Sequence, residues 1–466
     1  MKQELDFMSA LETRAAIARK AVSPVEVVQR ALERMDETEP RLNAFATRTP
    51  ELALAAARKA EQAVMDGTAL GLLHGLPVSI KDLITVAGVP CSFGSRTLAD
   101  NLAALDAPAT ERIKAAGGCI IGKTTTSEFG CKAVGDSPLT GITRNPWDLT
   151  RTPGGSSAGA AASVAAGVSA LALGTDGGGS LRIPASMTNL FGIKAQFGRV
   201  PVFPASATPT LAHVGPLTRT VRDSALLLQA IAGYDPRDPF SVAGAVPDFL
   251  AACDKPVKGM RIAWSPTLGY AKPLPEVVEI AERAARTFEE MGCTLELVEN
   301  VMDDPGELWM AEFYAGVGTR LQNVLRDQPD LIDSAVSDVL AGALDQTLDE
   351  YYAKVFARYD FREKMRQFFG KYDLLLTPTI PVPAPQIGVN VPPEVAGRNI
   401  VSWVFYTYPF NLTGQPAASA PAGMTKDGLP VGLQIVGPMH GECAIFRAAA
   451  ALEEARPWSE HRPKGF

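Results

Sequence analysis

Short apolar runs alternate with segments of helical periodicity along most of this chain of 466 residues. The stretch Ser23-Pro24-Val25-Glu26 predicts a helix start, since it combines an N-cap serine, a proline in the first turn and a capping-box glutamate. Residues 276–292 carry a second helical pattern. Strands are predicted at the apolar runs, which are residues 76–80, 119–122, 168–174, 261–264, 294–298, 373–378 and 431–437. This alternation indicates an α/β protein with a largely buried sheet.

Two unusual stretches bear on domain organisation. The proline-rich residues 377–394 look like a linker, but the segments on both sides read as parts of one sheet, so we expect a long ordered loop. The uncharged residues 156–175 consist mainly of Ala, Gly and Ser, which predicts a closely packed helix and a strand rather than a membrane span. We therefore expect one domain.

Composition excludes some classes of partner. Hydrophobic residues make up 46% and charged residues 20%, as in ordinary globular proteins, and the formal net charge is −7. Nucleic acids and anionic membranes both bind preferentially to basic surfaces, so neither is an expected partner of this acidic chain. The six cysteines form no C-x-x-C pair and the N-terminus has no apolar signal region, which favours reduced thiols and a cytoplasmic location.

A nucleotide-binding pattern, GGCIIGKT, occupies residues 117–124 and would place Lys123 on a phosphate. A P-loop needs a strand before the first glycine and a helix after the lysine. Here a helical run precedes the glycines and residues 119–121 are strand-like. The context therefore favours a helix, a glycine C-cap and a strand over a P-loop.

A second pattern, GSSAG at residues 155–159, matches the nucleophile elbow and would make Ser157 a nucleophile. Such an enzyme also needs an acid and then a histidine, and His213, His440 and His461 stand in a suitable order without a distinctive neighbourhood. A glycine–serine helix start explains the same residues, so the elbow is kept as an alternative.

A wider pattern joins GLPVSIKD at 75–82, GGSSAG at 154–159 and GTDGGGSLRIPA at 174–185. In this order the three stretches resemble the amidase signature family of serine hydrolases, and the similarity extends over nearly the whole chain. The resemblance implies the amidase signature fold, a central mixed twisted β-sheet covered by helices on both sides. It also implies a single amidase domain over 1–466, with a signature core at about 70–220 and a divergent helical, substrate-lining region at about 240–370.

Amide hydrolysis needs an activated nucleophile, a proton donor for the leaving amine and stabilisation of the oxyanion. Only four histidines are present, and a lysine can act as the base when burial keeps it neutral. The resemblance implies that Lys81 is this base and that Ser156, beside a cis peptide bond, relays protons. It implies that Ser180 is the nucleophile that forms an acyl-enzyme.

The glycine run before Ser180 has no Cβ atoms, so its N–H groups can crowd around a carbonyl oxygen. We expect the oxyanion hole within this run, at Gly177, Gly178, Gly179 and Ser180. The charged residues of the same motifs, Asp82, Asp176 and Arg182, are expected to fix geometry rather than to react.

The substrate is predicted to be a neutral, hydrophobic or aryl amide, with carbamates as further candidates, and neither a cofactor nor a metal is expected. Candidate pocket residues lie in a segment similar to the family's acyl pocket, in the divergent region and in an aromatic run: Gly130, Cys131, Lys132, Trp309, Phe313 and Val404. A related family member, the component of glutaminyl-tRNA amidotransferase that frees ammonia from glutamine, has an acidic residue in place of Val404 and a glutamine in place of Ile183. Both departures count against a glutamine-hydrolysing subunit, which remains the alternative. A homodimer is left open.

Overall fold

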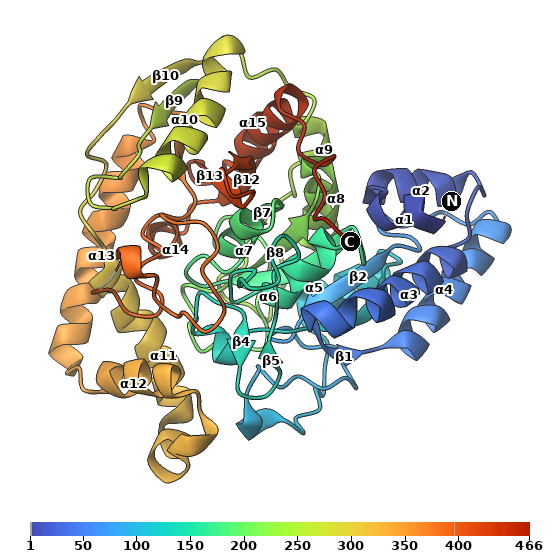
Figure 1. Ribbon diagram of the computed structural model, residues 1–466, viewed down its shortest axis with the longest axis horizontal. Helices are drawn as coiled ribbons and strands as arrows, with labels where there is room; N and C mark the ends of the chain where they lie inside the picture. The colour runs from blue at the N-terminus through green and yellow to red at the C-terminus, as the bar shows by residue number, and fades with distance from the viewer. Residues whose placement is uncertain (1, 396) are drawn as a thin grey trace.

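The computed structural model describes residues 2–395 and 397–466, and in this part of the chain eleven strands form one mixed sheet (Figure 1). In spatial order they are β1 (Phe45–Arg48), β3 (Cys119–Thr124), β2 (Pro77–Lys81), β6 (Leu171–Asp176), β8 (His213–Thr218), β7 (Phe191–Lys194), β12 (Ala417–Met424), β13 (Pro430–Val436), β11 (Leu374–Pro378), β9 (Arg261–Trp264) and β10 (Thr294–Leu297). The pairs β2–β3, β2–β6, β9–β11 and β9–β10 are parallel, and the other neighbours are antiparallel. Two short strands, β4 (Asp136–Ser137) and β5 (Gly141–Ile142), pair separately.

Both faces of the sheet are covered, because alternate strand residues enter different cores. Leu171 and Leu173 of β6 join one core, whereas Ala172 between them joins another. The first face carries α5 (Pro108–Ala115), α8 (Val221–Ile231), α9 (Phe249–Ala252), α10 (Pro275–Glu290) and α15 (Glu442–Ala455). The second carries α3 (Pro24–Leu42), α4 (Pro50–Met65), α6 (Ala158–Ala165), α7 (Arg182–Met187) and α14 (Pro409–Thr413). This is the α/β architecture predicted from the sequence.

Three further helices form an arm at the left of Figure 1, coloured yellow to orange. They are α11 (Gly306–Asp327), α12 (Ser334–Leu344) and α13 (Leu348–Phe368). Their buried side chains share a core with Leu375 and Val436 on the second face of the sheet. The remaining helices, α1 (Lys2–Phe7) and α2 (Ala10–Ala18), lie at the N-terminal end. The predicted division into a core and a substrate-lining helical region stays a prediction.

Local expectations from the sequence are largely confirmed. Helix α3 has the capping box on Ser23 and the proline in its first turn, and each of the seven predicted strands coincides with a strand. Residues 156–175 contain α6 and most of β6. Residues 379–392 form neither helix nor strand, half of them are buried and Gln386 bridges to Arg151, as expected of an ordered loop. No helix in the described residues has both the length and the apolarity to cross a bilayer.

The nucleotide-binding pattern has no structural support. Its middle residues belong to β3, and α5 ends just before its first glycine. The Lys123 amine is fully buried and donates a hydrogen bond to Asp82 at 2.8 Å. A strand in place of the loop leaves no backbone cradle for a phosphate.

Candidate active site

Lys81 is the last residue of β2, and Thr175 and Asp176 end the neighbouring strand β6. The two strands are parallel, with Ile80 beside Leu173 in the register, so their carboxyl ends meet at the same edge of the sheet. The glycine run leaves this edge directly after β6. Sheet topology therefore brings Lys81 beside the GTDGGGS segment.

The buried Lys81 amine contacts three hydroxyl groups. Its Nζ lies within hydrogen-bond distance of Ser156 Oγ at 2.7 Å, Thr175 Oγ1 at 2.8 Å and Ser157 Oγ at 3.0 Å. Burial lowers the pKa of Lys81 well below its usual value, although the Asp176 carboxylate acts in the opposite direction. A neutral amine keeps two N–H groups and one lone pair, so two hydroxyls can accept hydrogen bonds while the third donates. The site is thus suited to proton transfer from a hydroxyl to Lys81.

The two adjacent serines of the GGSSAG stretch differ in their surroundings. The Gly155–Ser156 peptide bond is cis, and Ser156 lines a cavity. Ser157 is fully buried at the start of α6, and its Oγ bonds the backbone O and N of Thr175 at 3.2 and 3.3 Å. It does not belong to the described residues that line the cavity. A nucleophile elbow requires an exposed hydroxyl, which Ser157 lacks.

Ser180 follows the glycine run, two residues before α7 begins, and is partly exposed to the same cavity as Ser156. Among the described residues its hydroxyl has no hydrogen-bond partner. One free hydroxyl and one lysine-bound hydroxyl therefore line the same cavity.

The protein holds the carbonyl groups of the glycine run on one side. Trp309 Nε1 donates to Gly177 O at 2.8 Å, and Thr407 Oγ1 donates to Gly178 O at 2.6 Å. The N–H and C=O of a trans peptide unit point in opposite directions. The N–H of Gly178 is therefore directed away from the indole, and the peptide planes are fixed rather than loose.

Gly179 differs from its neighbours because its N–H already donates to Asp176 Oδ1 at 2.8 Å. Within the described residues, the N–H groups of Gly177, Gly178 and Ser180 have no partner. The four-residue oxyanion hole expected from the sequence thus narrows to three available donors. The Gly179 N–H is excluded because it is committed to the carboxylate.

Close contacts explain why this run must be glycine. A Cβ on Gly178 would lie 2.6 Å from Trp309 Cζ2, and one on Gly179 would lie 2.4 Å from Thr407 Oγ1. Gly179 also has φ of +137°, which side chains rarely tolerate. The loop is therefore constrained by its neighbours.

Asp176 and Arg182 form a fully buried ion pair behind the loop, with Arg182 Nη2 2.9 Å from Asp176 Oδ1. Burial alone would raise the pKa of Asp176, but the guanidinium holds it well below its usual range. Arg182 also donates to Thr407 O, Gln434 Oε1 and Asn411 Oδ1. These bonds tie the loop to α14 and β13.

Asp82, next to the lysine, is also committed to protein partners. It accepts hydrogen bonds from Ser92 N at 3.0 Å and from Ser92 Oγ at 2.5 Å, and it forms a buried ion pair with Lys123 at 2.8 Å. These contacts are compatible with a group that fixes geometry, and that role stays a prediction.

The cavity has a volume of about 540 Å³ and mostly apolar walls. Aromatic and aliphatic side chains dominate, including Phe93, Phe129, Phe203, Phe313, Leu83, Ile84, Val202, Val214 and Val317. His213 also lines it, with Nδ1 2.7 Å from Leu211 O, and burial lowers the pKa of its imidazole well below the usual value. A neutral, mostly apolar ligand fits such walls.

The predicted pocket residues divide into two groups. Gly130 and Phe313 line the cavity, and a Cβ on Gly130 would lie only 3.2 Å from Ser156 Oγ. The other four, which are Cys131, Lys132, Trp309 and Val404, are buried and fall outside the described lining. Cys131 and Val404 pack into the core, Lys132 pairs with Asp136 and Asp333, and Trp309 supports the glycine run.

Several residues that shape the site carried no signal strong enough to be singled out. Thr175 lies inside a recognised motif, so its position next to the glycine run was the available clue. Thr407 reaches the site from a remote segment, and only the folded topology brings it there. His213 was named from the sequence only as a partner for the nucleophile elbow, and its place in the cavity lining also depends on the folded topology.

Comparison with known proteins identifies the family. The family model described as Amidase matches residues 26–446, and the chain belongs to this amidase signature family of amide hydrolases. The chain is similar to an acylamidase of Rhodococcus erythropolis, at 36% identity over 99% of this chain and 98% of the relative. It is equally similar, at 36% identity over 99% of both chains, to a subunit of the glutamyl-tRNA(Gln) amidotransferase of Moorella thermoacetica. Among solved structures, a bacterial aryl acylamidase of the amidase signature family superposes with a TM-score of 0.91 at 30% identity, covering 97% of each chain.

Proposed function

We propose that this amidase hydrolyses a neutral, hydrophobic or aryl carboxylic amide to a carboxylate and an amine through a Ser180 acyl-enzyme. The observation that carries the proposal is that the buried Lys81 amine lies 2.7 Å from Ser156 Oγ, and that Ser156 lines the same cavity as the free hydroxyl of Ser180. Carbamates can follow the same acyl-transfer route.

In the first half-reaction Ser180 Oγ attacks the amide carbon. The Ser180 proton passes to Ser156 Oγ, and the Ser156 proton passes to the lone pair of Lys81 Nζ. The carbonyl oxygen becomes an oxyanion that accepts hydrogen bonds from the N–H groups of Gly177, Gly178 and Ser180. The Ser156–Lys81 step joins atoms 2.7 Å apart, and the proposed relay uses only side chains of this chain.

Collapse of the oxyanion re-forms the carbonyl and breaks the C–N bond. The leaving nitrogen takes the proton held on Lys81, delivered through Ser156. Water then attacks the ester by the same relay, and the C–O bond to Ser180 breaks. The acid and base roles thus alternate on the same lysine.

A glutamine-hydrolysing amidotransferase subunit is the second candidate, supported by the 36% identity to an amidotransferase component. Binding the glutamine ammonium group calls for an acidic residue in the cavity. Val404 is a buried apolar residue, and the one carboxylate that lines the described cavity, Asp176, is already paired with Arg182. The apolar walls therefore favour the hydrophobic amide.

The six free cysteines fit a reducing cytoplasmic location.

A panel of an anilide, an alkyl amide, a carbamate and glutamine tests the proposal with the wild-type enzyme and two serine variants. We expect turnover of the anilide but not of glutamine, and a loss of about 10⁴-fold or more in kcat for Ser180→Ala. Ser157→Ala is the matched control, because Ser157 also contacts Lys81 yet lies off the cavity. Full activity of Ser180→Ala together with inactivity of Ser157→Ala would overturn the assignment.

A further inference from the structure

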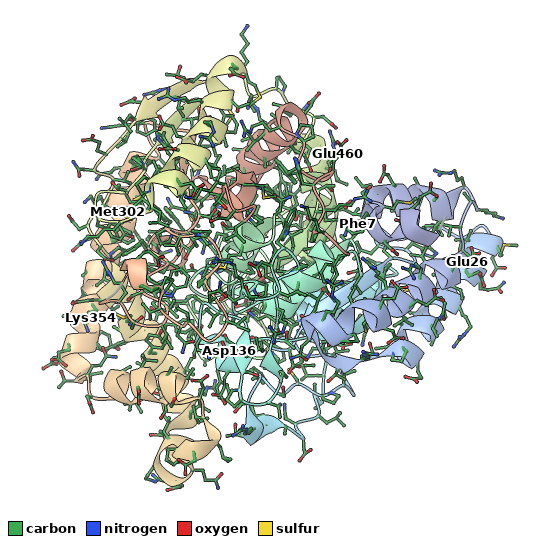
Figure 2. The ribbon with its side chains drawn as sticks, in the orientation of Figure 1. Phe7, Glu26, Asp136, Met302, Lys354 and Glu460 are labelled. Atoms are coloured by element: carbon green, nitrogen blue, oxygen red, sulfur yellow. The ribbon has the colours of Figure 1, made fainter. Side chains whose placement is uncertain are left out.

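Helix α11 contributes one face to the cavity that holds Ser156 and Ser180. The residues of this face recur at spacings typical of one side of a helix, and they are Phe313, Val317, Arg320, Leu321 and Val324. Helix α11 lies on the inner side of the arm, whereas Lys354 of α13 marks the outer side, at the periphery of the molecule in Figure 2. The cavity therefore follows α11 over about three turns, or about 16 Å.

The two ends of this face differ in their surroundings. Phe313 is buried against the glycine run, since a Cβ on Gly177 would lie 2.8 Å from Phe313 Cε2. Arg320 is exposed to solvent, as are Pro204 and Ala205, which line the same cavity. Phe313 thus marks the reacting end and Arg320 marks the mouth. The two residues are about 10 Å apart along the helix axis.

Arg320 is the one lysine or arginine in the described cavity lining. His213 is the other lining residue that can carry a positive charge, and burial lowers the pKa of its imidazole well below the usual value. The carboxylate of the lining, Asp176, is already paired with Arg182. Within the part of the chain that the structure describes, Arg320 has neither an ion pair nor a hydrogen bond from its guanidinium. Its charge is therefore available to a ligand.

The surface next to Arg320 is apolar. Val317 is 3% exposed and Leu321 is 9% exposed, so the wall on both sides of Arg320 is buried. A charge pair against a wall of low dielectric constant is screened less than one in open water. An amide that ends in an ammonium group would meet a like charge at the same place. The mouth of the cavity can thus select ligands by the sign of their charge.

We propose that Arg320 binds a carboxylate at the far end of an elongated substrate, in which an apolar body about 10 Å long separates the carboxylate from the scissile amide. The inference rests on the proposed amidase reaction and narrows its substrate. The amide and the apolar body are neutral, and only the end at the mouth carries charge. A guanidinium group donates two parallel hydrogen bonds to a carboxylate, which fixes the position of the substrate along the cavity.

Matched amides that differ only at their far end test the proposal. One member ends in a carboxylate, one in a methyl group and one in an ammonium group, each on an apolar spacer of about 10 Å. The spacer is attached to the acyl group in one series and to the amine in a second series, because the scissile amide has two sides. We expect the wild type to prefer the carboxylate in at least one series, mainly through a lower KM, since this contact forms with the substrate as well as with the transition state.

Three variants of the helix separate charge from shape. Arg320→Gln should reduce the preference for the carboxylate over the methyl end by about tenfold, and Arg320→Lys should restore part of it. Arg320→Glu should shift the preference to the ammonium end. Raising the salt concentration from about 0.01 M to about 1 M should also reduce the wild-type preference, because the Debye length falls from about 30 Å to about 3 Å.

Arg326→Gln is the matched control. Arg326 is an exposed arginine on the same helix, but it pairs with Asp327 and lies outside the described cavity lining. This variant should keep the wild-type preference for the carboxylate. A loss as large as that of Arg320→Gln would show that the preference arises from the general charge of the helix and would overturn the assignment to Arg320.

Binding to the Ser180→Ala protein distinguishes this inference from the proposed function. Calorimetric titration with the carboxylate substrate measures affinity without turnover, and Arg320→Gln in this background should bind about tenfold more weakly. Equal affinity with and without Arg320, or a wild-type enzyme with no preference for the carboxylate, would overturn the carboxylate site and leave amide hydrolysis intact. Binding that depends on Arg320 in a protein that hydrolyses no amide would support the site and overturn the proposed function alone.

Discussion

Lys81 combines two properties that oppose each other in most proteins, complete burial and an ionisable amine. Its three hydroxyl neighbours satisfy the hydrogen-bonding capacity of a neutral amine without supplying a negative charge. The nearby Asp176 is paired with Arg182, which limits its pull on the Lys81 proton. Burial can therefore keep Lys81 neutral, and this is the state that a general base requires.

The pH dependence of stability follows from this lowered pKa. The side chain of an unfolded lysine has a pKa of about 10.4. Between the lowered pKa of folded Lys81 and this value, the unfolded chain binds a proton that the folded chain does not. Wild-type stability therefore gains a positive contribution as pH rises through this window. Lys81→Met removes this contribution, so we expect its melting temperature relative to wild type to fall as pH rises from about 7 to about 10.

Differential scanning calorimetry of both proteins measures this difference, and the activity of the wild type provides a second readout. The wild-type kcat/KM should decline as pH falls through the lowered pKa, because protonated Lys81 cannot accept a proton. A melting-temperature difference that is constant over the whole range would indicate that Lys81 has the same pKa in both states.

Sequence patterns identified the catalytic candidates at the residue scale but not all of their neighbours. Lys81, Ser156 and Ser180 each stand in a motif, and the structure brings the first two into direct contact. Whether a residue faces the cavity or lies behind its wall depends on side-chain direction. Sequence patterns therefore could not separate Phe313, on the wall, from Trp309, four residues earlier on the same helix and behind it.

At the scale of elements, α11 supports the glycine run from outside the signature motifs. The Trp309 indole donates to Gly177 O, and its ring stacks on Phe313 with centroids 4.5 Å apart. The neighbouring Gly178 N–H is one of the three N–H groups of this run that have no partner within the described residues and that we propose as oxyanion donors. The orientation of that donor thus depends on a helix in the divergent part of the chain.

Trp309→Phe should test this dependence, because it keeps the aromatic packing and removes only the indole N–H. We expect kcat to fall by about 10- to 100-fold with little change in KM, less than the 10²–10³-fold loss from removing an oxyanion donor outright. The interaction acts in the transition state, so a transition-state analogue should lose affinity in parallel with kcat.

Trp403→Phe is the matched control for this prediction. Trp403 is also fully buried, and its Nε1 donates to Asn390 O at 3.0 Å, away from the glycine run. Both variants should lose similar stability, but the control should keep its kcat. Equal losses of kcat in the two variants would show that Trp309 acts only through stability.

Strands with runs of Leu, Ile and Val were predictable, whereas β7, β8 and β12 were not. Their sequences FGIK, HVGPLT and AASAPAGM contain glycine, proline and alanine, which carry a weak strand signal. These strands lie in the middle of the sheet, where neighbours on both sides and helices on both faces stabilise them. Tertiary context outweighs local preference there.

At the scale of the whole molecule, the fold joins residues that sequence motifs point out to residues that no motif marks. The proposed base, relay and nucleophile come from the ends of β2 and β6 and from the loops beside them. The apolar cavity and the support for the loop include contributions from α11 and the segment before α14. The candidate catalytic residues could therefore be proposed from motifs, whereas the walls of the cavity depend on remote packing.

The central claim is that Ser180 is acylated, and trapping the acyl-enzyme tests it most directly. Incubation with a slowly hydrolysed carbamate, followed by intact mass measurement and peptide mapping, locates the covalent group. We predict one acyl group per chain, on Ser180, in the wild type and none in Ser180→Ala. A label on Ser157, or unlabelled wild-type enzyme that still turns over the carbamate, would contradict the account.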